Sequence, residues 1–236
     1  MSMRKKLNET VGKIPCIGDM LTTEVSAKGI AGFVIGSYMA LVNAVPALAA
    51  NVTVEGVSGE DTGTLDTKVS GTIPGNIGYF FRNRTSIDYE ADNDVSAFSL
   101  LDITYPLGRG FDAVAEGQFP NELPFDPRLG MQYFKDFKNG LTAYALITRN
   151  FNENPNTELT TVLGYSKDLD GKWKLVGRWE ELINIGDKNY NFDVTRLRLG
   201  IGINDIVIGP SLDISDIGSE QGPEYFPGGF MTVKIK

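Results

Sequence analysis

Hydrophobic and polar residues alternate with a period of two along most of the chain from about residue 77 onward. Between Ile77 and Tyr89 the odd positions are mostly apolar or aromatic, whereas the even positions include Arg82, Arg84 and Asp88. Successive side chains of a β-strand point to opposite faces of the sheet. The pattern therefore predicts a strand with one apolar face and one charged face.

The same alternation returns often enough to predict about ten strands. The further segments begin near Val95, Phe111, Leu129, Leu141, Leu159, Trp173, Leu197, Ile206 and Met231. Many of them approach the roughly 9 to 11 residues that a tilted strand needs to cross a bilayer. Strands of globular proteins usually have about 5 to 6 residues, so these lengths favour a membrane barrel over a sandwich.

The connections between the predicted strands alternate between longer and shorter ones. Asn139-Gly140 and Asp170-Gly171 are typical of tight hairpins, because both central residues of such a turn favour a positive φ. Longer connections are expected at 120–126, 152–156 and 216–228. Short turns on one side and longer loops on the other are typical of transmembrane β-barrels.

The first fifty residues have the order of a secretory signal. Arg4, Lys5 and Lys6 precede an apolar stretch at 29–45, and small residues follow up to Ala50. We expect residues 1–50 to be a signal peptide. Residues 51–76 are rich in Gly, Thr, Asp and Ser and are predicted to be a flexible periplasmic leader or a plug, which leaves residues 77–236 for the barrel.

Together the signal segment, the long alternating strands and the alternating loops resemble a small bacterial outer-membrane β-barrel with porin-like architecture. The fold class is then all-β, an antiparallel up-and-down transmembrane barrel of about ten strands. The resemblance implies that the protein lies in the cell outer membrane, surrounded by its lipid. It also implies a narrow porin-like channel or a structural barrel with a charged lumen.

Alternation by itself does not say which face points outward. A secreted, soluble, lipocalin-like barrel would place the apolar residues around an apolar ligand and the charged residues in water. A surface adhesin that acts through its long loops is a further alternative. Strand length and loop alternation favour lipid on the apolar side, so we expect the charged face to line the lumen.

On the membrane interpretation the charged positions become candidates for the lumen and its constriction. These candidates are Arg82, Arg84, Asp88, Asp112, Glu116, Arg178, Glu180, Arg196 and Arg198. Charged interiors serve two uses, a salt-bridged core that keeps the barrel rigid and a narrow solute pathway. Arg196 and Arg198 share one strand face and, with Arg178, are the best candidates for a positive constriction that favours small anionic solutes.

Composition removes several other classes of function. The 236 residues include no histidine and one cysteine, which excludes Ser-His-Asp and Cys-His catalysis and metal sites with histidine ligands. The 22 basic residues stand against 30 acidic ones, a net charge of -8, so nucleic acid is not an expected partner. The sequence predicts no enzyme, no cofactor and no metal site.

Overall fold

The computed structural model describes residues 51–89, 94–121, 124–186, 190–216 and 222–235. The chain divides into two compact units, Met1–Val45 and Pro46–Lys236, and all described residues belong to the second. The predicted signal peptide at 1–50 lies outside the described residues. No helix within the described ranges is long and apolar enough to cross a membrane.

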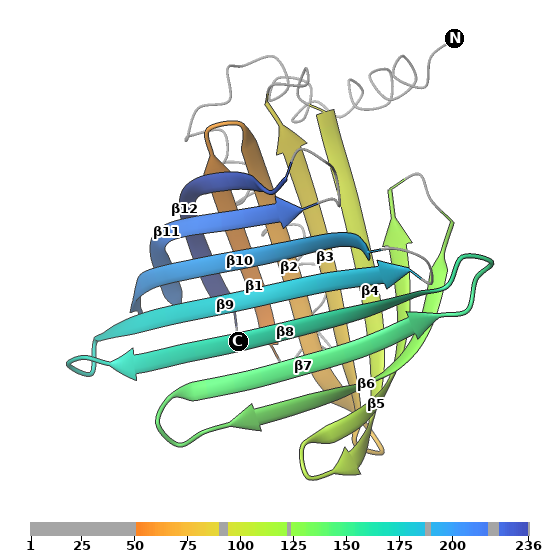
Figure 1. Ribbon diagram of the computed structural model, residues 1–236. Coiled ribbons are helices and arrows are strands. Elements are labelled where there is room, and N and C mark those ends of the chain that lie inside the picture. Colours follow the sequence, from red (N-terminus) through yellow and green to blue (C-terminus); the bar gives the residue numbers. More distant parts are fainter. Residues whose placement is uncertain (1–50, 90–93, 122–123, 187–189, 217–221, 236) are drawn as a thin grey trace, which may run out of the picture. The chain divides into compact units, whose positions relative to one another are not determined.

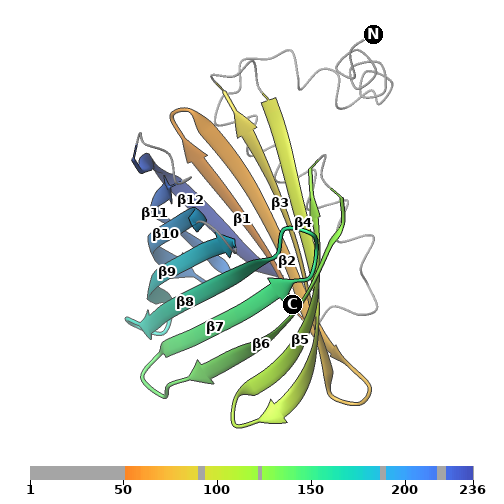
Figure 2. The same ribbon diagram turned by 45° about the vertical axis from the view of Figure 1, so that its right-hand side comes forward.

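Twelve antiparallel strands form a closed barrel in up-and-down order (Figures 1 and 2). They are β1 (Asn51–Gly59), β2 (Thr62–Ile73), β3 (Ile77–Asp88), β4 (Asp94–Gly108), β5 (Phe111–Pro120), β6 (Asp126–Asp136), β7 (Leu141–Asn150), β8 (Asn156–Asp168), β9 (Trp173–Gly186), β10 (Tyr190–Ile203), β11 (Ile206–Asp216) and β12 (Glu224–Ile235). Figure 1 shows β7 to β10 crossing in front of β1 to β4, as expected for strands that are tilted around a barrel.

Closure depends on β1, which pairs with β2 on one side and with β12 on the other. Val52 lies opposite Ile235 and Gly59 lies opposite Gly228, so the ladder between the first and the last strand includes every residue of β1 after Asn51. With this pairing no strand of the barrel is left with a free edge, the arrangement that a hydrocarbon environment requires.

The predicted antiparallel barrel is confirmed, but it has twelve strands instead of about ten. β3 to β12 are the ten predicted strands, but the segment 51–76 is not a leader or a plug: it forms β1 and β2. The two strands are joined to the rest by a turn in which Gly75 and Asn76 have positive φ, 92° and 59°. Threonine and valine, which favour strands, recur throughout this segment.

Burial shows which way each face points. On β5, Val114, Glu116 and Gln118 are buried, whereas Phe111 and Phe119 are exposed. Exposed hydrophobic side chains recur on β4 and on β6 to β11, and among the buried side chains of the described residues polar ones outnumber hydrophobic ones. The barrel therefore has an apolar outside and a polar inside, the reverse of a lipocalin-like arrangement.

The loop that the adhesin alternative required is shorter than expected. The sequence placed a connection at 216–228, but β12 already begins at Glu224, so Tyr225, Phe226 and Pro227 are strand residues. Tyr225 pairs with Ile214 of β11 and is exposed on the barrel wall. These aromatic residues belong to the barrel rather than to a projecting loop.

The apolar outer wall leads to a test of its contact with lipid. Leu199 is exposed near the middle of the long strand β10, and we expect Leu199→Arg to lower the free energy of unfolding by about 2–4 kcal/mol, the cost of a cation near the bilayer midplane. Leu107 is equally exposed but lies at the end of β4, so Leu107→Arg should cost at most about 1 kcal/mol. Urea unfolding from phospholipid vesicles measures both, and equal costs would contradict a lipid-facing wall.

Candidate functional site

The interior contains a cluster of charged side chains contributed by strands from both sides of the barrel, which we call the arginine cluster. Its basic members are Lys68, Arg82, Arg84, Arg178, Arg196 and Arg198, and its acidic members are Glu55, Asp66, Glu180 and Asp213. Alternation positions these residues, because each occupies the inward face of its strand.

One ion pair of this cluster crosses the lumen. Arg82 on β3 and Glu180 on β9 approach to 3.3 Å between Nη1 and Oε1. β3 and β9 are six strands apart in either direction around the twelve-stranded ring, so they lie on opposite walls. Their contact therefore bridges the interior from one side to the other.

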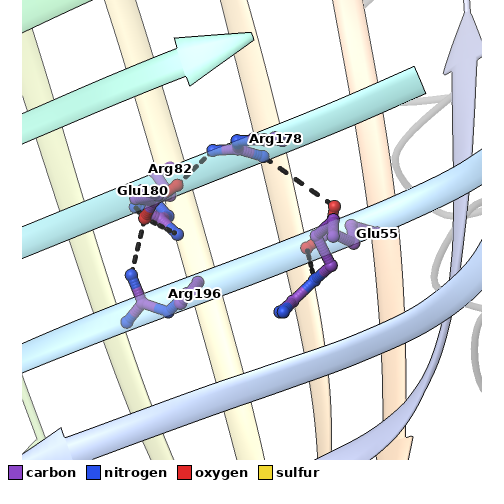
Figure 3. Close-up of a pocket in the computed structure, with 6 residues that line it drawn as sticks. Glu55, Arg82, Arg178, Glu180 and Arg196 are labelled. Atoms are coloured by element: carbon purple, nitrogen blue, oxygen red, sulfur yellow. Dashed lines mark hydrogen bonds and ion pairs between the residues drawn. The ribbon is translucent and has the colours of Figure 1, made fainter. Parts of the chain in front are cut away.

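Glu180 accepts hydrogen bonds from three arginines (Figure 3). Its Oε1 accepts from Arg82 and, at 2.5 Å, from Nη1 of Arg196 on β10, while its Oε2 accepts from Arg178 two residues earlier on β9. Glu180 is almost fully buried, with 2% of its surface exposed. A buried carboxylate needs such partners, because burial without them removes its hydration without compensation.

Other carboxylates contact Arg82 and two further arginines, Arg84 and Arg198. Asp66 on β2 accepts from Nε of Arg82 at 2.9 Å and from Nη2 at 2.5 Å, which is a bidentate contact. Asp213 on β11 contacts Arg84 at 3.4 Å and also accepts from Arg198. Arg82 is thus held by the neighbouring strand β2 as well as by Glu180, whereas Arg84 on β3 reaches Asp213 on the more distant strand β11.

A second set of wall contacts involves β1, one of the strands that the sequence did not predict. Glu55 lies within 3.4 Å of Nε of Arg198 and within 3.8 Å of Nη1 of Arg178, and it accepts a hydrogen bond from Thr232 at 3.1 Å. Glu55 is buried. It joins β1, β9, β10 and β12 at the level of the arginine cluster.

The arginine cluster is tightly packed. Six side chains, those of Glu55, Arg82, Arg178, Glu180, Arg196 and Arg198, surround a space too small for a water molecule. The cluster also has more basic members than acidic ones, six against four. A passage opened here by side-chain movement would have a positive lining, which favours anions.

The wall formed by β4 to β8 has the opposite character. Asp102, Glu116 and Arg128 lie directly opposite one another on adjacent strands, and all three are at most 4% exposed. Arg128 approaches Glu116 at 3.3 Å and Asp126 at 2.9 Å. Nε of Arg128 also donates to the hydroxyl of Thr148 at 3.0 Å.

Further carboxylates extend this acidic wall. Gln118 donates to Glu116 at 2.9 Å and to Glu158 at 3.3 Å, and Asn184 donates to Glu158 at 3.4 Å. Carboxylates outnumber cations here, in contrast to the arginine cluster. Within the part of the chain that the structure describes, no group of three or more acidic or cysteine side chains is placed to hold a metal ion.

The candidates from the sequence fall into four places. Arg82, Arg84, Arg178, Glu180, Arg196 and Arg198 meet in the arginine cluster, and Glu116 belongs to the acidic wall. Asp112 lies apart from both and accepts from Gln132 at 2.8 Å, while Asp88 is exposed at the end of β3. Glu55, Asp66 and Lys68 were missed because their strands were assigned to a leader, although the alternation of Asp66 and Lys68 with Leu65 and Val69 was a usable signal.

No family model matches the chain, and no curated protein matches it. Among solved structures, the NanC porin superimposes with a TM-score of 0.52 at 12% identity, over 80% of this chain and all of NanC. LpxR from Salmonella typhimurium has a TM-score of 0.48 at 10% identity, over 78% of this chain and 99% of its own. The KdgM porin has a TM-score of 0.47 at 9% identity, over 77% and 98%.

At this identity the likeness to NanC shows the fold. The protein is an outer-membrane type of β-barrel, closed and antiparallel, with twelve strands. Within that class its architecture is porin-like, as the alternating strands predicted.

The buried pair of Glu116 and Arg128 makes a stability test possible. We expect Arg128→Met to lower the free energy of unfolding by about 3–5 kcal/mol, because Glu116 is left buried without its cation. The cost of the double variant Arg128→Met/Glu116→Gln should be at least about 1 kcal/mol smaller than the sum of the costs of the two single variants, because the two residues interact directly. Urea unfolding in vesicles measures this, and strictly additive costs would show that the pair is not coupled.

Proposed function

We propose that the protein is a narrow channel of the bacterial outer membrane that passes small anionic solutes and carries out no catalytic step. The observation that carries the proposal is the arginine cluster, in which six basic and four acidic side chains meet across the lumen. Six of these side chains leave no room for a water molecule between them, and we infer that their rotation opens the pathway.

A location in the outer membrane is supported by the outer wall and by the start of the chain. The exposed residues of β10 and β11 include Leu199, Ile201, Ile206 and Ile208, a surface that suits hydrocarbon. Residues 1–50 have the order of a secretory signal, which would deliver the chain across the inner membrane.

Anion preference follows from the balance of charge at the narrowest level. The arginine cluster has two more basic than acidic side chains, so its own net charge is positive. In a narrow lumen with low-dielectric walls such a charge raises the local concentration of anions. The fold shared with NanC, whose name describes it as a porin, agrees with a transport role.

A structural barrel without a pathway is the second candidate. It is favoured by the acidic wall, where Glu116 and Arg128 are each almost completely buried and fill the interior beside β4 to β7. A purely structural barrel would conduct no ions in any variant. Conductance therefore separates the two candidates.

Neutralising the positive excess should change ion selectivity. In the double variant Arg196→Gln/Arg198→Gln the cluster has four basic and four acidic members, so we expect the preference for chloride over potassium to fall towards one. The reversal potential in planar bilayers under a potassium chloride gradient measures the preference. Lys135→Gln/Lys138→Gln removes the same charge from exposed positions and serves as the control. An unchanged reversal potential in the arginine variant would reject these residues as the selectivity determinant.

A further inference from the structure

Three arginines, Arg82, Arg178 and Arg196, donate hydrogen bonds to the one carboxylate of Glu180. We propose that Arg82, Arg178 and Arg196 form a binding site for the carboxylate group of a solute, and that Glu180 occupies this site when no solute is bound. The role of the site in permeation rests on the channel function proposed above, whereas the binding itself does not.

The site has the chemistry of a carboxylate receptor. Both oxygens of Glu180 are engaged, Oε1 by Arg82 and Arg196 and Oε2 by Arg178. Guanidinium groups suit carboxylates because their donors lie in one plane and can contact both oxygens. A solute carboxylate in the place of the Glu180 carboxylate would accept the same hydrogen bonds.

The three arginines keep other partners when Glu180 moves away. Arg82 remains held by Asp66 through Nε at 2.9 Å and Nη2 at 2.5 Å. Arg196 lies within 4.0 Å of Asp213, and Arg178 lies within 3.8 Å of Glu55. The receptor is therefore preorganised by the walls of the barrel, which reduces the entropic cost of binding a ligand.

Glu180 acts in this arrangement as a tethered competitor. A ligand binds only in the fraction of molecules in which Glu180 has left the site, so the apparent dissociation constant is raised in proportion. Because the contact of Glu180 with Arg82 links β3 to β9 across the lumen, displacement of Glu180 removes this link at the place where the solute binds. A carboxylate shifts the population towards the open state, and a neutral solute does not.

A binding experiment tests the receptor directly. Glu180→Gln keeps the shape of the side chain but removes the competing charge. Glu158→Gln is the matched control, because Glu158 is another buried interior carboxylate whose partners are Gln118 and Asn184 rather than arginines. Potassium glucuronate is titrated calorimetrically into each folded protein in detergent at constant ionic strength, with glucose as the neutral probe.

We expect Glu180→Gln to bind glucuronate about tenfold more tightly than the wild type, as removal of an occupant from the site implies. Glu158→Gln should bind like the wild type, and glucose should not bind. Adding Arg82→Gln to Glu180→Gln should abolish the gain. Equal affinities in the wild type and Glu180→Gln, or a gain that persists without the Arg82 guanidinium, would overturn the proposal.

Planar-bilayer recording separates this inference from the channel function. In the wild type, glucuronate should raise the conductance and glucose should not, whereas Glu180→Gln should conduct without glucuronate. A gain in binding without conductance in any variant would reject the channel and leave the carboxylate site standing. Conductance without the gain in binding would leave the channel standing and reject the site.

Discussion

The pairing of backbone polar groups is the constraint on which the rest of the structure depends. In hydrocarbon an unpaired N–H or C=O has no water to bond, so a sheet must close upon itself. β1 performs this closure, since it pairs with β2 along one side and with β12 along the other. Once the ring is complete, the side chains of each strand point alternately to the outer face of the barrel and into the lumen.

The lumen then receives charged groups at a density that forces them to pair. Asp66, Glu180 and Glu116 are each at most 4% exposed, and each contacts an arginine. The arginines involved are Arg82, which belongs to the arginine cluster, and Arg128, which belongs to the acidic wall. Because these carboxylates are buried, removing the arginine partner of any one of them leaves a buried charge without compensation and destabilises the protein.

The period of two was sufficient to predict the class of fold and ten of the strands, and it placed Arg82, Glu180 and Glu116 on inward faces, whereas Asp88 is exposed at the end of β3. It failed at β1 and β2, where Gly56 and Gly71 interrupt the apolar face and small polar residues made the segment look like a linker. It could not predict which residues meet, because Arg82 and Glu180 are 98 positions apart and only the stagger of the closed ring brings them together. An odd or even position tells whether a side chain points inward, but the stagger between strands determines which side chain it meets.

The seam between the first and last strands has a consequence for biogenesis. Since β1 finds its second neighbour only in β12, the strand synthesised earliest keeps a bare edge until the final segment of the barrel is available. Such an edge is a template for adhesion to other chains. Assembly is therefore complete only when the two ends of the described barrel come together.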